Sequence, residues 1–468
     1  MGRGFLIPGG FIAGGVLATL FLRGAPAAVS ADLAQPLAVV TYWQGFGTRL
    51  WIALFAAIAV AAIGYFLVLR ACSREDVSAP SMASIIALCA LSCAIALGFP
   101  VLFSSDVYAY AAYGDMALHG MDPYGHIRAA FHDRLFDAAL WQWGDPLPVA
   151  VYGPLFVGIA RDAVLIFRAH AVSAPLWALR VLSCLALIAC APLAYLAFGE
   201  FSKRIRITAA AGITLNPMAI WASAEGHNDA LLLAIVLLGF ALIARARFVI
   251  GAAVVALAAL VKAPALAAAV GAIAASRHDR RRFAKVVSGA ALGAVIVLIV
   301  SGPLVLGIGS RLIPGGHYAP QFSVQAALAL ALPVRIAAIA GAAIAGAFII
   351  TGGLQMLRNN GEGSLLVALG AWLAIPNPYP WYALWILPIA FVAWKTPAAY
   401  ALIAASLLAV IRYYPDAFTD VSGWTAVGLV ACTTGIPLLI FSAGTIRAYR
   451  VRRENQRTAP SFAPLHSR

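Results

Sequence analysis

The chain has 468 residues, of which 63% are hydrophobic and only 11% are charged, and its mean hydropathy is +0.91. A water-soluble protein of this length needs far more polar surface, so the composition excludes a soluble enzyme and indicates a polytopic membrane protein. The net charge of +14 does not indicate a nucleic-acid partner, because the basic residues follow the distribution of membrane-protein inner loops. Anionic membrane lipids are sufficient partners for them.

Apolar runs long enough for membrane helices recur along the whole chain. They cover residues 5–23, 49–71, 84–103, 173–198, 208–223, 229–244, 284–307, 334–357, 364–376, 380–394, 397–411 and 424–446. We therefore expect an all-α fold, a bundle of about 12–14 membrane helices with one broken hairpin. One integral-membrane domain spans 1–447 in this interpretation, and 448–468 form a basic cytoplasmic tail. The first run resembles a signal peptide, although a retained helix leaves the topology unchanged.

Basic residues between the runs set the orientation in the cell (inner) membrane. Lys203, Arg204 and Arg206 mark one inner end, and the C-terminal tail marks another. The outer loops are then 24–48, 104–172, 224–228, 308–333, 377–380 and 412–423. The segment 151–168 would invert every later loop if it crossed, so we expect an amphipathic helix on the outer membrane surface there.

An acidic residue, Asp106, stands where the run 84–103 leaves the membrane on the outer side. Tyr108 and Tyr110 follow it, and a Gly120-Met-Asp122-Pro-Tyr124 turn comes next. A charge at such a position is unfavourable unless it has a function, so we interpret this loop as an active site centred on Asp106. The alternative is that Asp106 only caps the helix that follows.

Polar residues crowd the short outer turn between two further apolar runs. The turn contains Glu225, His227, Asn228 and Asp229, and Asn216 stands before it. So many polar groups would be strongly disfavoured in lipid, so we expect them to face a wet cavity or an acceptor substrate. An ordinary polar turn, with Asp229 capping the next helix, is the alternative.

Lys262 lies in the middle of an apolar stretch from Phe248 to Ser276 whose two flanks are basic. Basic flanks indicate that both ends of this stretch lie on the cytoplasmic side, so the chain must enter the membrane and return. We therefore expect two half-helices that meet near Lys262 and Pro264. The free backbone ends and the buried cation of such a break suit an anionic ligand. A single tilted span with a snorkelling lysine is the alternative.

Further candidates lie in the remaining outer loops. Arg311 and His317 flank a di-glycine, and together with Arg412 they are candidates for a phosphate site. For Arg412, a role as an interfacial anchor explains the position equally well. Tyr379 and Trp381 lie in a proline-rich reversal and suit either sugar stacking or the interfacial aromatic belt. The spacing of the loop residues His119, His126 and His132 does not match a zinc site.

Several of these motifs occur together, and in this order, in one family. They are Asp106-Val-Tyr-x-Tyr with Gly120-x-Asp-Pro-Tyr124, Tyr152-Gly-Pro-Leu155, Asn216-Pro217 with Gly226-His-Asn-Asp229, Leu260-Val-Lys-Ala-Pro264 and Tyr379-Pro-Trp-Tyr382. The sequence resembles the GT-C superfamily of membrane glycosyltransferases, in particular the polyprenol-phosphate-mannose-dependent α-mannosyltransferases of actinobacterial lipoglycan synthesis. The resemblance covers most of the chain from about residue 100 to about residue 395.

The resemblance implies a polyprenyl phosphosugar donor, an extracytoplasmic glycan or glycolipid acceptor, and transfer with inversion on the outer side. Asp106 is then the catalytic base. The donor phosphate is expected to lie among Lys262, Arg311, His317 and Arg412. The residues expected to shape the cavity or to bind the acceptor are Tyr108, Tyr110, Asp122, Tyr152, His227, Asn228, Asp229, Tyr379 and Trp381.

Two features depart from the family pattern. Many GT-C enzymes have an Asp-x-Asp pair, whereas Asp106-Val-Tyr108 carries one acid. A lone carboxylate is a poor divalent-metal site, so we expect no metal cofactor. A large soluble C-terminal domain, present in some relatives, is not expected here, so the outer loops must recognise the acceptor.

Other functions stay open at this point. A transporter or flippase of a lipid-linked sugar would share the broken helix, but it does not need Asp106 outside the membrane. A scaffold of a cell-envelope complex would tolerate the loss of both Asp106 and Lys262. Within the enzyme class, the sugar is mannose if the resemblance holds, with arabinose, glucose and galactose as alternatives.

Overall fold

The fold is all-α, as the sequence predicts, and the described part of the chain contains no strand. The structure is a computed structural model that describes residues 3–23, 47–74, 79–98, 101, 104–125, 133–143, 147–170, 173–302, 323–358, 361–413 and 423–458. The longer helices are α1 (Arg3–Arg23), α3 (Gly47–Ser73), α4 (Met82–Leu97), α5 (Asp106–Leu118), α6 (Arg134–Trp143), α7 (Pro154–Phe167), α8 (Ala174–Ala197), α9 (Lys203–Thr214), α10 (Pro217–Ala224), α11 (Asp229–Ala244), α12 (Phe248–Leu257), α13 (Ala265–Ala275), α14 (Arg280–Ser301), α17 (Val334–Leu357), α18 (Gly363–Ala374), α20 (Pro397–Leu408), α22 (Gly423–Val430) and α23 (Ile436–Thr458). Shorter helical elements are η2 (Ala258–Leu260), α16 (Val324–Leu328), η3 (Pro380–Tyr382), α19 (Ala383–Ile386), η4 (Leu387–Phe391), η5 (Ala409–Tyr413) and η6 (Ala431–Gly435).

Several of these helices can cross a membrane. Within the described residues, 5 helices are long and apolar enough to span it, or up to 6 if the bent pair α10 and α11 forms one span. Further apolar helices have only 10–17 residues, among them α4, α12, α13 and α18. The expected runs 380–394 and 397–411 are among the short ones, because prolines at positions 380 and 397 begin new helices.

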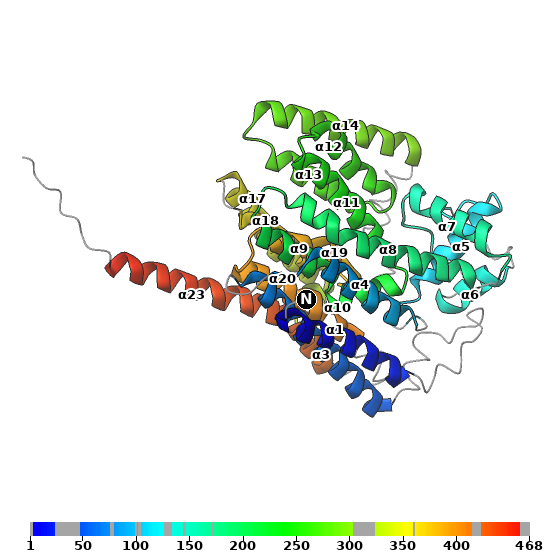
Figure 1. Cartoon of the computed structure of the whole chain (residues 1–468), viewed down its shortest axis with the longest axis horizontal. Helices are drawn as coiled ribbons and strands as arrows, with labels where there is room; N and C mark the ends of the chain where they lie inside the picture. The colour runs from blue at the N-terminus through cyan, green and yellow to red at the C-terminus, as the bar shows by residue number, and fades with distance from the viewer. Residues whose placement is uncertain are drawn as a thin grey trace, which may run out of the picture.

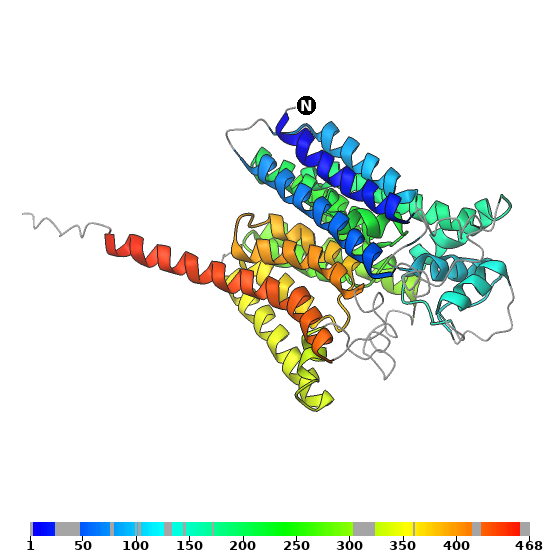
Figure 2. The same ribbon diagram turned by 90° about the horizontal axis from the view of Figure 1, so that it is seen from below.

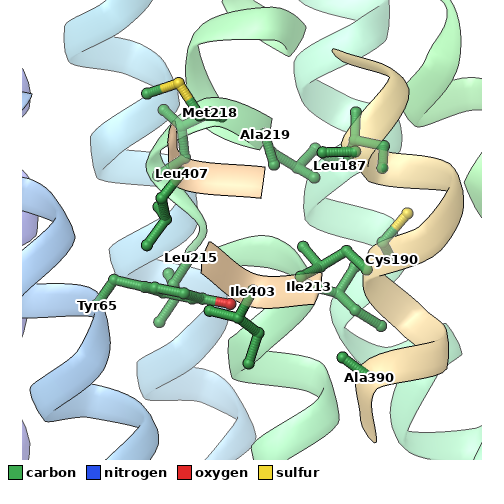
Figure 3. Close-up of a cluster of buried hydrophobic side chains, with 14 of the residues drawn as sticks. Tyr65, Leu187, Cys190, Ile213, Leu215, Met218, Ala219, Ala390, Ile403 and Leu407 are labelled. Carbon is green, nitrogen blue, oxygen red and sulfur yellow. The ribbon is translucent and has the colours of Figure 1, made fainter. Parts of the chain in front are cut away.

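The core lies where α3, α8, α9, α10, η4 and α20 meet (Figure 3). Tyr65 of α3 reaches into it, and its hydroxyl donates to the carbonyl of Gly212 in α9 at 2.7 Å. Five of the six cysteines are buried, as small core residues are. Helix α23 projects away from this core in both views (Figures 1 and 2) and runs without a break through residue 447, the expected end of the membrane domain.

Helices α11 to α14 lie together on one side of the bundle (Figure 1). Glycines let α11 and α12 approach closely, because a Cβ atom on Gly239 would lie 2.7 Å from the Gly251 carbonyl oxygen. Ala252, early in α12, shares a buried cluster with Ala272, late in α13. These two helices therefore form the predicted broken hairpin, with its break at 261–264.

Helices α5, α6 and α7 gather at one end of the molecule in both views (Figures 1 and 2). A charged cluster joins them: Arg168, which caps the end of α7, lies 3.3 Å from Asp115 of α5 and 3.5 Å from Asp133 before α6. Helix α7 is the amphipathic helix expected over 151–168, with one face on α5 and with exposed Leu165 and Ile166 on another. The ion pairs of Arg168 thus join the last turns of α5 and α7 to the segment before α6.

Candidate active site

Asp106 is the first residue of α5, and three hydroxyl groups surround its carboxylate. Ser104 Oγ donates to Oδ1 at 2.9 Å, while Tyr110 OH and Tyr152 OH donate to Oδ2 at 3.2 and 3.5 Å. The N-cap of α5 is Ser105, whose side chain makes no capping hydrogen bond, and Ser104 Oγ accepts from the backbone N–H of Asp106 at 3.1 Å. Helix capping therefore does not account for the carboxylate of Asp106.

The carboxylate of Asp106 lies in a poorly solvated place, since the residue is only 8% exposed. Burial raises its pKa above the ordinary value, and hydrogen bonds from Ser104 and Tyr110 and the charge of Lys262 partly oppose that rise. A carboxylate with a raised pKa and neutral hydroxyl partners is suited to accepting a proton from a substrate.

The turn between α10 and α11 places His227 beside Asp106. The helix axis bends by 116° between the two helices, and Gly226 has a φ of +89°, a conformation that favours glycine. Arg180 donates to the carbonyl of Ala224 at 2.5 Å, at the end of α10. The His227 Nδ1 atom consequently lies 3.6 Å from Asp106 Oδ2, too far for a direct hydrogen bond.

Lys262 stands at the break between η2 and α13, and it pairs with Asp229 at the start of α11. The Lys262 Nζ to Asp229 Oδ1 distance is 2.9 Å, and Trp385 Nε1 donates to the same oxygen at 2.7 Å. The Lys262 side chain is 10% exposed and that of Asp229 is fully buried. Such a buried ion pair excludes a snorkelling lysine, and it also excludes helix capping as the only role of Asp229.

Aromatic rings enclose the ammonium group of Lys262. Its Nζ atom lies 5.6 Å from the centroid of Tyr152, 5.3 Å from that of Tyr382 and 5.1 Å from that of Trp385. Tyr152 thus contacts both charged groups, with its hydroxyl on Asp106 and its ring beside Lys262. The neighbouring Gly153 allows this placement. Its N–H donates to the carbonyl oxygen of Val261 at 2.9 Å, and a Cβ atom at this position would lie only 2.1 Å from the carbonyl oxygen of Leu260, so a side chain would not fit.

The proline-rich reversal at 376–382 contributes a stack of aromatic rings. The ring of His227 lies on that of Trp381 at 3.9 Å, and Trp381 lies on Tyr379 at 4.5 Å. The guanidinium group of Arg412 covers the Tyr379 ring at 3.4 Å. Arg412 is buried, which does not fit an interfacial anchor in contact with lipid headgroups.

Other predicted site residues lie elsewhere. Tyr108 is buried on α5, where the charge of Arg180 acts on it. Asp122 is exposed, and its carboxylate accepts from the Tyr124 N–H within its own turn at 2.9 Å. Arg311, His317, His126 and His132 lie outside the described residues. Across the part of the chain that is described, no group of three or more His, Cys, Asp or Glu side chains could hold a metal.

Sequence reasoning missed two residues that shape the site, Arg180 and Trp385. Arg180 is an arginine inside an otherwise apolar helix, and a buried charge there is itself a signal. Trp385 follows Tyr382 by three residues, which puts both on one face of a helical turn. The structure otherwise brings Asp106, Tyr110, Tyr152, His227, Asp229, Lys262 and Trp381 into one continuous set of contacts.

A polytopic helical membrane protein with a buried carboxylate, an enclosed lysine and stacked aromatic rings has the groups needed for transfer chemistry on a polar substrate. A family model described as alpha-(1->6)-mannopyranosyltransferase, N-terminal domain, matches residues 9–277. The chain belongs to this family, and it is a membrane glycosyltransferase of the mannosyltransferase type. No curated protein and no solved structure matches the chain.

Proposed function

We propose that the protein transfers a mannosyl group from a polyprenyl-phosphate donor to a hydroxyl group of an extracytoplasmic glycan or glycolipid, with inversion. The observation that carries this proposal is the buried carboxylate of Asp106, which is bound only by hydroxyl groups within the described residues and lies beside an enclosed cation. The family description supports mannose as the sugar and an α-(1→6) linkage as the product.

Asp106 acts as the general base in this proposal. The acceptor hydroxyl gives its proton to the carboxylate while its oxygen attacks C1 of the sugar. The bond between C1 and the phosphate oxygen breaks, and the electron pair leaves with the polyprenyl phosphate. Because one displacement inverts C1, a β-phosphomannose donor gives an α-mannoside.

Lys262 binds the donor phosphate in this proposal. An ammonium group has three N–H donors, and the contact with Asp229 uses one of them. The others can bind phosphate oxygens and stabilise the negative charge that develops as the phosphate leaves. Arg412, and Arg311 and His317 in the loop outside the described residues, remain proposed helpers. We propose that this cation replaces a divalent metal.

The orientation of the protein also belongs to the proposal. The basic residues at 203–206 and in the C-terminal tail favour the inner side, which places the start of α5 on the outer side and the C-terminus in the cytoplasm. The lipid tail of the donor would then lie among the membrane helices, and the acceptor would reach Asp106 from outside.

The test is transfer of radiolabelled mannose from a short-chain polyprenyl phosphomannose to a mannoside by purified protein. We expect Asp106→Asn to lower the rate by roughly 10²- to 10⁴-fold, because it removes the proton acceptor. The control, Asp162→Asn, changes a carboxylate of α7 that is 56% exposed and should leave the rate unchanged. Wild-type transfer rates in a normally folded Asp106→Asn protein would refute the assignment of the base.

A further inference from the structure

Buried polar atoms without hydrogen-bond partners concentrate in the turn before α11. Among the described residues, neither ring nitrogen of His227 and neither amide atom of Asn228 has such a partner. Each of the two residues is only 1% exposed. Buried polar groups normally make their hydrogen bonds, so two adjacent exceptions, of which His227 lies 3.6 Å from Asp106 Oδ2, indicate a ligand.

Asn216, at the other end of α10, shows that the fold can satisfy a buried asparagine. Its Oδ1 atom accepts from the Met218 N–H at 2.9 Å, and its Nδ2 atom donates to Ser406 Oγ at 2.9 Å. Asn216 is also 1% exposed, so burial does not distinguish it from Asn228. The difference lies in the partners: those of Asn216 come from the protein.

The segment that carries His227 and Asn228 is fixed by other groups. Arg180 binds the carbonyl of Ala224, and Ser183 donates to the carbonyl of His227. Trp381 covers one face of the His227 ring and leaves the nitrogen atoms at the ring edge without partners in the described chain. The backbone of the turn and the His227 ring are therefore held in place without using the hydrogen-bonding atoms of the His227 and Asn228 side chains, as in a preorganised binding site.

The geometry limits the chemistry of the ligand. A hydroxyl oxygen can lie within hydrogen-bond distance of both His227 Nδ1 and Asp106 Oδ2, since these atoms are 3.6 Å apart. The negative charge of Asp106 disfavours an anionic group at this position next to His227. An amide offers one donor and one acceptor group, which matches a further hydroxyl or a neighbouring pair of hydroxyls on the same sugar.

We propose that His227 and Asn228 form the subsite for the acceptor sugar: His227 and Asp106 share the reacting hydroxyl, and the Asn228 amide binds another hydroxyl of the same ring. This inference rests on the proposed function, since the acceptor rather than the donor brings a hydroxyl to the base. The subsite therefore sets which acceptor reacts, whereas Lys262 serves the donor.

The experiment compares Asn228→Leu with Asn216→Leu in the full-length protein. The probes are an alkyl α-(1→6)-linked mannose disaccharide and mono-deoxy forms of it, with polyprenyl phosphomannose as donor. We expect Asn228→Leu to raise the acceptor KM roughly tenfold to a hundredfold with little change in donor KM, because one set of hydroxyl contacts is lost. The mono-deoxy acceptor that lacks the hydroxyl bound by Asn228 should then have the same KM as the parent disaccharide in this variant.

Thermal unfolding separates a binding role from a structural one. An Asn228→Leu protein should melt at the wild-type temperature or above, because it loses no protein partner, whereas Asn216→Leu should melt lower. The disaccharide should raise the melting temperature of wild type and of Asp106→Asn, and should fail to do so for Asn228→Leu. This binding readout stays informative if no mannosyl transfer is found, so the subsite and the proposed function can fail separately.

Three results would overturn the proposal. A raised donor KM with an unchanged acceptor KM would assign Asn228 to the donor sugar. A lower melting temperature with unchanged kinetics would make Asn228 structural. An acceptor-induced stabilisation equal to that of wild type in Asn228→Leu would remove the side chain from the subsite.

Discussion

The starts of α5 and α11 present the same residue in the same helical position with different partners. Asp106 and Asp229 are each the first residue of a helix, and both are buried. Asp106 accepts hydrogen bonds from three hydroxyl groups, whereas Asp229 accepts from the ammonium group of Lys262 and the indole of Trp385. Their helix positions are equivalent, so the partners must account for any difference in role.

This contrast separates two tasks within one site. Hydroxyl donors favour the carboxylate form without holding it there by a full charge, so Asp106 can take up and release a proton. A lysine at 2.9 Å holds its partner carboxylate by a charge-assisted bond, so Asp229 is suited to positioning Lys262. The donors around each carboxylate thus support the proposed roles of Asp106 as base and of Asp229 as a positioning residue.

The strongest test of the comparison removes the cation of the ion pair. We expect Lys262→Met to lower stability by about 3–5 kcal/mol, because Asp229 then remains as a buried charge without its partner. Thermal unfolding in detergent measures the loss. The double variant Lys262→Met with Asp229→Asn should recover much of the lost stability. Its activity with the donor should stay low, because the cation is still missing.

The control is Lys285→Met, which makes the same change at an exposed lysine of α14 and should leave stability unchanged. A Lys262→Met protein as stable as wild type would show that Asp229 does not depend on its cation. The contrast between the two aspartates would then lose its physical basis.

Much of the fold follows from the sequence, because its signals are local. The apolar runs give the helices, and the basic flanks of the stretch around Lys262 predict the hairpin of α12 and α13. The lengths of individual helices were harder to predict, since prolines at positions 217 and 397 start new helices inside or between apolar runs. Hydropathy alone does not show where such a run divides.

The residues of the site could be found from the sequence, but most of their pairings could not. Asp106, Asp229 and Lys262 stand out as charges in or beside apolar segments. The contact between Asp229 and Lys262 joins positions 33 residues apart, and that between His227 and Trp381 depends on how distant helices pack. Asp122 is expected from the resemblance among the cavity or acceptor residues, whereas in the structure it is exposed and accepts from its own turn, because the same residue type also serves in local turns.

A smaller effect should follow when one hydroxyl partner of Asp106 is removed. Burial raises the pKa of Asp106, and the Tyr110 hydroxyl at 3.2 Å lowers it by binding the carboxylate form. Tyr110→Phe should therefore raise this pKa further. Because the base must be deprotonated, the acid limb of the kcat/KM profile should move to higher pH, while the rate at the plateau changes little.

The control for this shift is Tyr113→Phe. Tyr113 lies on the same helix, and its hydroxyl donates to the carbonyl of Pro148 at 2.7 Å. Its removal should leave the acid limb in place. Equal profiles for Tyr110→Phe and wild type would mean that Asp106 does not titrate in the reaction.

The smallest effect concerns Asp115, a third buried carboxylate at the other end of α5. Burial, and next the nearby Asp133, raise the pKa of Asp115 from 3.8 to about 6, which Arg168 and His119 oppose. The folded protein then binds more protons than the unfolded chain between these values, so this group makes stability fall as pH rises from about 4 to about 6. Asp115 is thus a structural carboxylate, whose stability contribution depends on pH.

Arg168→Gln should make that pH dependence steeper. We expect a loss of at most about 1 kcal/mol, because the arginine side chain is 39% exposed and solvent weakens its ion pairs. The loss should be larger at about pH 7.5 than at about pH 5, since Asp115 is mostly protonated below its pKa and needs the cation less. Arg161→Gln, whose pair with Asp162 on the same helix is exposed, should show no such difference. Equal losses at both pH values for Arg168→Gln would mean that Asp115 keeps its charge throughout, and the distinction between hydroxyl-bound and cation-bound carboxylates would then rest on Asp106 and Asp229 alone.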